Sequence, residues 1–154
     1  MKRSLLCLLG LLLLCSCDKK YESSIPDTFV DIELYLSQED WRLTESLSHK
    51  TFTQIRPPYI RAIGFGGVIV YHGLSTGSIG NDYYAFDMAC PHEAHKGTLV
   101  EVDDSNIHAI CPKCGSKFEL IYGVGNPVSG PAKYPLKTYP TTKIADKLYI
   151  RYIY

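Results

Sequence analysis

The sequence that decides the fold reads Cys90-Pro91-His92 and then, after residues 93–110, Cys111-Pro112-Lys113-Cys114-Gly115-Ser116-Lys117-Phe118. The two-residue gap between Cys111 and Cys114 lets two side chains of one tight turn face the same metal. The one-residue gap between Cys90 and His92 places two further ligands on one face of an extended loop end. Three thiolates and one imidazole suit zinc or iron–sulfur chemistry. The sequence therefore predicts two loops that meet at one metal centre.

Short strand-like segments surround both motifs, and no long helical pattern occurs. We expect strands at 30–34, 66–72, 83–88, 98–102, 107–110, 118–120, 136–139 and 147–152. Residues 37–49 fit either an irregular loop or one helical turn. With 12 Tyr, 12 Gly and 9 Pro in 154 residues, the composition favours short strands joined by turns in one domain. The prediction is an all-β antiparallel sandwich or barrel without an internal repeat.

The composition excludes one class of partner. The formal net charge is +0, so no basic footprint indicates a nucleic-acid partner. No Ser/His/Asp set, phosphate-binding glycine loop or carboxylate pair indicates a catalytic pocket. We therefore expect the protein not to be a stand-alone enzyme.

The N-terminus has the pattern of an export signal. Met1-Lys2-Arg3 is a positive n-region, and Leu5–Leu14 is an apolar run too short to span a bilayer as a helix. Leu14-Cys15-Ser16-Cys17 resembles a bacterial lipoprotein signal, which implies cleavage before Cys17 and a lipid on its sulfur. The alternative is a plain secretory signal with an incidental cysteine.

This resemblance divides the chain into a signal peptide (1–16), a lipidated cysteine with its spacer (17–25) and one domain (26–154). It implies a protein of the bacterial cell envelope that is tethered to a membrane on the periplasmic or outer face.

The cysteine count favours a metal. Of 6 Cys, Cys7 and Cys15 leave with the signal and Cys17 takes the lipid, so the two motifs hold the rest. Exported proteins usually pair their cysteines, but three thiols cannot pair fully. A metal centre uses all of them. A disulfide in a metal-free protein stays an alternative.

The two motifs resemble a Rieske-type iron–sulfur domain, a family with C-x-H in its first loop and C-x-x-H in its second. Cys90 and His92 match the first loop, and Cys111 begins the second, but Cys114 replaces the second histidine. Later matches are the glycine-serine pair, a following strand and a loop that covers the cluster: Gly115-Ser116, Phe118-Glu119-Leu120 and Gly130-Pro131-Ala132. The resemblance spans about residues 66–154, with the cluster-binding part at about 88–135.

The resemblance implies a Rieske-like β-sandwich with a two-loop cluster-binding subdomain and a [2Fe–2S] cluster. Cys90 and Cys111 would hold the inner iron, and His92 and Cys114 the outer iron. A thiolate adds negative charge and stabilises the oxidised cluster. We therefore expect a reduction potential between roughly −400 and −150 mV, below the Rieske range.

Residues near the ligands would tune this potential. Ser116 would donate a hydrogen bond to a bridging sulfide, and Gly130 and Pro131 would shape the surface over the cluster. Phe118 stands where high-potential members have a tyrosine, so one donor is missing. His95 is a candidate substitute ligand, although a solvent-facing loop position is favoured for it.

Two hypotheses follow. The first is an envelope-anchored electron-transfer protein with a [2Fe–2S] cluster and a redox partner protein. The second is an envelope lipoprotein with a binding or structural role, either with a Cys₃His zinc site or without metal, because Cys-Pro-Lys-Cys-Gly also occurs in zinc ribbons. A Rieske oxygenase is disfavoured because the chain lacks room for a mononuclear-iron catalytic domain.

Overall fold

The computed structural model describes residues 23–74 and 82–153, which form three four-stranded sheets with antiparallel pairing throughout. The sheet orders are β11-β12-β1-β3, β10-β5-β4-β2 and β6-β7-β8-β9. The strands are β1 (Val30–Tyr35), β2 (His49–Phe52), β3 (Ile60–Ile63), β4 (Val68–His72), β5 (Tyr83–Asp87), β6 (Glu101–Val102), β7 (His108–Ile110), β8 (Lys117–Glu119), β9 (Pro127–Ser129), β10 (Thr138–Tyr139), β11 (Thr141–Ile144) and β12 (Lys147–Tyr152). The expected all-β antiparallel class is confirmed.

The hairpin of β4 and β5 is the central wall of the molecule. The strands pair with Val70 opposite Ala85, as the sequence predicts for a hairpin. Successive side chains of a strand point to opposite faces, so Val70 packs in one core and Ile69 in another. Both faces are buried, which explains why this strand reads as a continuous apolar run.

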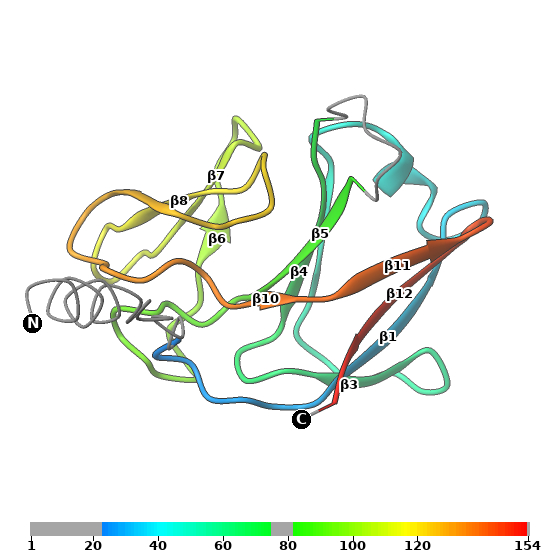
Figure 1. Cartoon of the computed structure of the whole chain (residues 1–154), viewed down its shortest axis with the longest axis horizontal. Helices are drawn as coiled ribbons and strands as arrows, with labels where there is room; N and C mark the ends of the chain where they lie inside the picture. Colours follow the sequence, from blue (N-terminus) through cyan, green and yellow to red (C-terminus); the bar gives the residue numbers. More distant parts are fainter. Residues whose placement is uncertain (1–22, 75–81, 154) are drawn as a thin grey trace, which may run out of the picture.

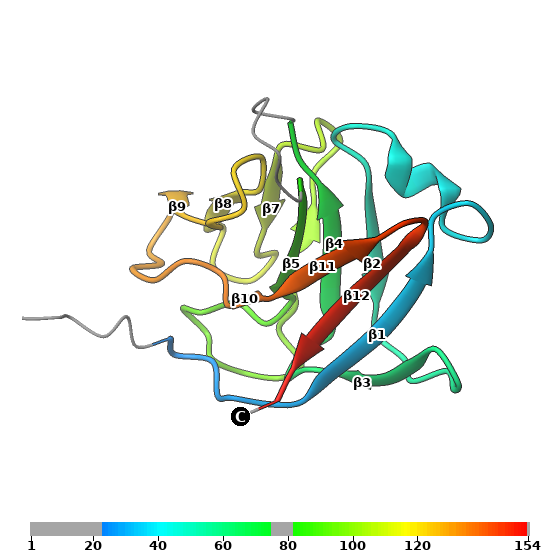
Figure 2. The same cartoon turned by 45° about the vertical axis from the view of Figure 1, so that its right-hand side comes forward.

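The first core lies between the β4–β5 wall and the sheet that contains β1 and β12. Alternate residues of β1 are buried, and Ile32 pairs with Ile150 across the two strands. Figures 1 and 2 show β1, β11 and β12 on one side of the β4–β5 hairpin. This part is a β-sandwich, and none of the three described cysteines belongs to its core.

The second core lies between the same wall and the small sheet β6–β9, which Figure 2 shows on the other side. Cys90 and Cys111 are completely buried in this core, together with Phe118 and Leu120. The hydroxyl of Tyr71 on β4 donates a hydrogen bond of 2.7 Å to the carbonyl of Asn106 in the β6–β7 turn. The small sheet is thereby fixed to the wall, and the cysteine loops form part of its core.

Four strands were not expected: β2, β3, β9 and β11. They lack a clear alternation of buried and exposed residues. In β2 only the last residue is buried, and in β11 no residue is fully buried. Their pairing with stronger neighbours, β4 and β12, supplies the stability that their own pattern lacks. Of the two interpretations of residues 37–49, the helical turn is the one that forms, as the 3₁₀ helix η2 (Trp41–Thr44).

Some sequence-based predictions concern residues outside the described ranges. These are the signal peptide at 1–16, the lipid on Cys17 and most of the spacer. Within residues 23–74 and 82–153, no helix is long and apolar enough to cross a membrane.

Candidate metal centre

The first metal loop (90–98) begins three residues after the end of β5. The backbone N–H of Cys90 donates to the carbonyl of Thr98 at 3.0 Å, and the N–H of Ala94 donates to the carbonyl of Cys90 at 2.9 Å. The first bond closes the loop and the second tightens its opening turn. Cys90 is therefore held at the base of the loop, where its side chain points into the second core.

The approach to this loop is fixed by a buried carboxylate, Asp87. It accepts backbone N–H bonds from Phe65 (2.8 Å), Gly66 (3.0 Å) and Ala89 (2.8 Å), and the hydroxyl of Tyr139 donates to it at 2.6 Å. A buried charge is tolerated when it is surrounded by donors in this way. The last residue of β5 thus ties the segment before β4 to the residue that precedes Cys90.

The second metal loop (111–116) is a tight turn between β7 and β8. The N–H of Gly115 donates to the carbonyl of Cys111 at 2.9 Å, and the N–H of Cys111 donates to the carbonyl of Ser116 at 2.9 Å. Gly115 has a φ of 71°, a left-handed conformation that favours glycine. This turn brings Cys111 and Cys114 to the same side, as their spacing predicts.

The two loops place three thiols together. The sulfurs of Cys90, Cys111 and Cys114 all lie within 4.8 Å of one another, and the Sγ atoms of Cys90 and Cys114 are 3.7 Å apart. Cys90 and Cys111 are buried and Cys114 is partly exposed. Three of the four predicted ligands therefore meet, although Cys90 lies far from the other two in the sequence.

The environment of these thiols affects their protonation. Burial raises the pKa of Cys90 to about 12. Burial also acts to raise the pKa of Cys114, but its contacts with Ser116 and the neighbouring thiols outweigh it and lower this pKa below its ordinary value. The metal-bound form of a cysteine is the thiolate, so metal binding at Cys90 would release its proton. The three-sulfur donor set therefore fits a thiophilic metal or an iron–sulfur cluster.

The imidazoles stand apart from this group. His92 is exposed, and its ring nitrogens do not belong to the 4.8 Å group of sulfurs. His95 is also exposed, and its Nδ1 accepts a hydrogen bond from the N–H of Gly97 at 3.1 Å. Both lie at the outer side of the first metal loop.

A lid of residues 130–132 covers the second metal loop. The N–H of Ala132 donates to the hydroxyl oxygen of the buried Ser116 at 3.0 Å, and this oxygen lies 3.2 Å from the sulfur of Cys114. Gly130 has a φ of 90°, and a Cβ there would lie 2.5 Å from the Cα of Ser116. The Cys114 thiol donates to the hydroxyl oxygen of Ser116, and this hydroxyl would become the donor when Cys114 is a thiolate. Pro131 is exposed on the outside of the lid.

Phe118 lies beneath the thiols on β8. It is completely buried in the second core and pairs with Ala109 on β7. Its ring presents carbon and no hydroxyl, so it contributes a dry wall and no hydrogen bond to a sulfur.

An ion pair between the loops was not foreseen from the sequence. Lys113 of the second metal loop binds Glu93 of the first, and this carboxylate holds the pKa of Lys113 above its ordinary value. The sequence did contain a signal for this pair. Glu93 directly follows the predicted ligand His92, and Lys113 lies between two predicted ligands of the second loop. Opposite charges at such positions are expected to meet once the loops do.

A hollow lies beside the lid, and none of the three cysteines lines it. It has a volume of about 1190 Å³ and is lined by residues such as Ser23, Lys133 and Lys137. Its lining also includes Asp27 and Tyr152, and the carboxylate of Asp27 pairs with Lys137 and accepts a hydrogen bond from Tyr152.

No protein-family model matches the chain, and no curated protein matches its sequence. The structure is similar to the crystal structure of the cyanobacterial plasma membrane Rieske protein PetC3 from Synechocystis PCC 6803. The two chains are 19% identical with a TM-score of 0.49, and the similarity covers 80% of this chain and 98% of that chain.

Proposed function

We propose that this protein is an iron–sulfur electron-transfer protein, a Rieske-like ferredoxin with one [2Fe–2S] cluster. The observation that carries the proposal is the meeting of three cysteine sulfurs from two loops, beneath a lid that contacts the second loop through Ser116. These are the loops and the lid that carry the sequence resemblance. A [2Fe–2S] cluster supplies one-electron oxidation and reduction.

In this proposal Cys90 and Cys111 hold the buried iron, and Cys114 and His92 hold the iron nearer the surface. The burial order agrees with this division, because Cys90 and Cys111 are buried while Cys114 is partly exposed and His92 is exposed. Phe118 and the second core exclude water from the inner side. Electrons would enter and leave at the exposed His92 side, beside the lid.

The third thiolate sets the proposed potential. A thiolate carries a negative charge that a neutral imidazole lacks, so replacing one histidine by Cys114 favours the oxidised state. Ser116 opposes this effect with its hydroxyl, which is 3.2 Å from the Cys114 sulfur. The expected potential is between roughly −400 and −150 mV, and a potential above 0 mV would exclude the proposed ligand set.

A structural zinc site is the second candidate, and one distance favours it. Two thiolates on one tetrahedral zinc ion with bonds of about 2.3 Å are about 3.8 Å apart. The Cys90–Cys114 sulfur distance is 3.7 Å, although the cluster proposal assigns these residues to different irons. In the zinc proposal the protein is a binding or structural lipoprotein of the envelope.

The proposed location follows from the N-terminal sequence. A lipid on Cys17 would tether the domain to a membrane of the bacterial envelope, on its periplasmic or outer face. The partner would be a redox protein that docks near the first metal loop and the lid. Nucleic acid is not a proposed partner, because the net charge is +0.

Metal and sulfide analysis of the purified protein tests the proposal. The cluster predicts a coloured protein with about two irons and two acid-labile sulfides per chain. A colourless protein with stoichiometric zinc and no labile sulfide would overturn it in favour of the zinc site.

A further inference from the structure

The first described residues, Ser23–Asp27, contact the first metal loop. The hydroxyl of Ser24 donates a hydrogen bond of 2.6 Å to the carbonyl of Pro91, which lies between Cys90 and His92. Pro91 is buried, and Ile25, which follows Ser24 in the chain, is only 2% exposed. A segment that the sequence assigns partly to a spacer thus packs directly on a metal loop.

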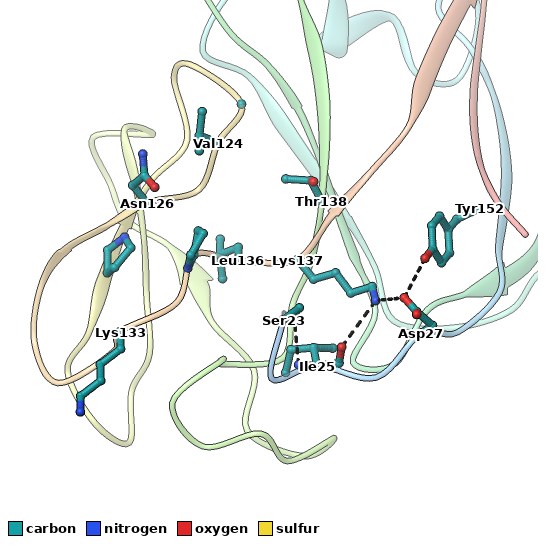
Figure 3. Close-up of a pocket in the computed structure, with 13 residues that line it drawn as sticks. Ser23, Ile25, Asp27, Val124, Asn126, Lys133, Leu136, Lys137, Thr138 and Tyr152 are labelled. Atoms are coloured by element: carbon teal, nitrogen blue, oxygen red, sulfur yellow. Dashed lines mark hydrogen bonds and ion pairs between the residues drawn. The ribbon is translucent and has the colours of Figure 1, made fainter. Parts of the chain in front are cut away.

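A buried lysine holds the same segment from the other side. Lys137 is 8% exposed, and its Nζ lies 3.5 Å from the carbonyl oxygen of Ile25 and forms an ion pair with Asp27 (Figure 3). The hydroxyl of Tyr152 donates to the same carboxylate at 2.7 Å. A buried ammonium that loses its partners is strongly destabilising, because its charge is no longer compensated. The docked segment therefore supplies a carbonyl and a carboxylate to the Lys137 ammonium, which also lies over the ring of Tyr152.

Lys137 also connects this segment with the approach to Cys90. Its carbonyl accepts a hydrogen bond of 2.8 Å from the backbone N–H of Asp87. Asp87 in turn accepts the N–H of Ala89. The segment is thus joined to both sides of Cys90, through Pro91 directly and through Lys137 and Asp87.

We propose that Ser23–Asp27 is a strap, in which Ser24 is a positioning residue that holds the first metal loop through Pro91. Five residues separate Cys17 from Ser23 in the sequence. A lipid on Cys17 would therefore attach the domain to a membrane through the chain segment that leads to the first metal loop. This inference rests on the proposed metal site, because the loop that the strap holds is the one that carries Cys90 and His92.

The test compares Ser24→Ala with two matched variants. Ser24→Thr keeps the hydroxyl at a half-buried position and serves as the rescue. Ser37→Ala removes a hydrogen bond of the same 2.6 Å length, from Ser37 to Asp146, at the β11–β12 turn on the far side of the molecule. The rate of metal release to a chelator and the thermal midpoint are measured for each variant.

Losing the Ser24 bond should accelerate metal release about three- to tenfold, the range expected for one hydrogen bond. The metal-release rates of Ser24→Thr and Ser37→Ala should stay within a factor of two of the wild-type rate. The thermal midpoints of these two variants should be similar to that of Ser24→Ala. Release from Ser24→Ala at the wild-type rate, or equal acceleration by Ser37→Ala, would overturn the strap.

The metal content of the wild type tests the proposed function separately. In a protein that purifies without metal, the alkylation rate of Cys90, followed by mass spectrometry, reports on the same loop. The strap predicts faster alkylation of Cys90 in Ser24→Ala than in Ser37→Ala, and equal rates would refute it.

Discussion

At the scale of single residues, Cys114 determines the chemistry of the proposed centre. It lies with Cys90 and Cys111 in one group, but it is the most exposed of the three, and its sulfur lies 3.2 Å from the hydroxyl oxygen of Ser116. Its pKa is lowered where that of Cys90 is raised. A ligand at this position reaches the surface side of the centre and influences its charge most directly.

Replacing Cys114 by histidine should raise the reduction potential. The change removes one thiolate charge from the centre and gives the second loop the C-x-x-H pattern. We expect the potential to move from below roughly −150 mV into the Rieske range, and the spectrum of the reduced protein to become more Rieske-like. A redox titration followed by electron paramagnetic resonance measures both, and an unchanged or lower potential would contradict the ligand assignment.

Tyr139 provides a second prediction at this scale. Burial first, and then the charge and hydrogen bond of Asp87, raise the pKa of Tyr139 above its ordinary value of about 10. Since the folded pKa lies above the unfolded one, this stabilisation is complete below pH 10 and is lost as the pH rises above it. Tyr139→Phe should lower the free energy of unfolding by about 1.5–3 kcal/mol at pH 7.

Between pH 10 and 11, Tyr139→Phe should lose less stability than the wild type, because phenylalanine does not ionise. Urea unfolding at pH 7, 9 and 10.5 checks both effects. Tyr122→Phe, at a tyrosine that is 63% exposed, is the control and should change neither quantity. Parallel pH dependences for Tyr139→Phe and wild type would contradict the assigned role of the Tyr139–Asp87 bond.

At the scale of elements, the two metal loops are connected by side chains as well as by the proposed metal. The Glu93–Lys113 ion pair spans them, and the lid packs on the second loop through Gly130 and Ser116. Glu93 has only 14% of its side chain exposed, whereas Lys113 has 64%. Lys113 therefore compensates the charge of the more buried Glu93.

Lys113→Gln should speed metal release and make it less sensitive to salt. The wild-type rate should rise with ionic strength as the ion pair is screened, while the variant starts at a rate about two- to fivefold higher and stays there. Arg61→Gln, which breaks the exposed Arg61–Asp31 pair on the first sheet, is the control. A variant that keeps the salt dependence of the wild type would show that the pair does not hold the loops together.

Gly130→Ala should open the lid. The substituted residue would have both an unfavourable φ of 90° and a Cβ 2.5 Å from the backbone of Ser116. Gly115→Ala is the matched variant, because its φ is 71° but its Cβ would meet nothing within 4 Å. We expect destabilisation of about 1 kcal/mol for Gly115→Ala and about 2–3 kcal/mol for Gly130→Ala in urea unfolding. Equal losses would mean that the lid does not pack tightly on Ser116.

At the scale of the whole molecule, the β4–β5 wall serves two cores, a β-sandwich on one side and the cysteine-containing sheet on the other. The continuous apolar run of β4 made this wall predictable. The second core includes the thiols themselves, so the metal centre and the fold share the same packing. Loss of metal is therefore expected to loosen the small sheet more than the sandwich.

The sequence predicts those features that depend on local pattern. Alternation identified β1, and loop spacing identified the convergence of Cys90, Cys111 and Cys114. Contacts between distant segments have no local pattern, which is why the Ser24–Pro91 bond could not be predicted. The fourth ligand stays a prediction, because His92 is exposed and outside the sulfur group.

Electron paramagnetic resonance of the dithionite-reduced, purified protein tests the central claim most directly. A [2Fe–2S] centre with three thiolates and one imidazole predicts a spin-½ signal that integrates to about one spin per chain and is absent from the oxidised protein. A silent reduced protein that contains stoichiometric zinc would contradict the iron–sulfur assignment.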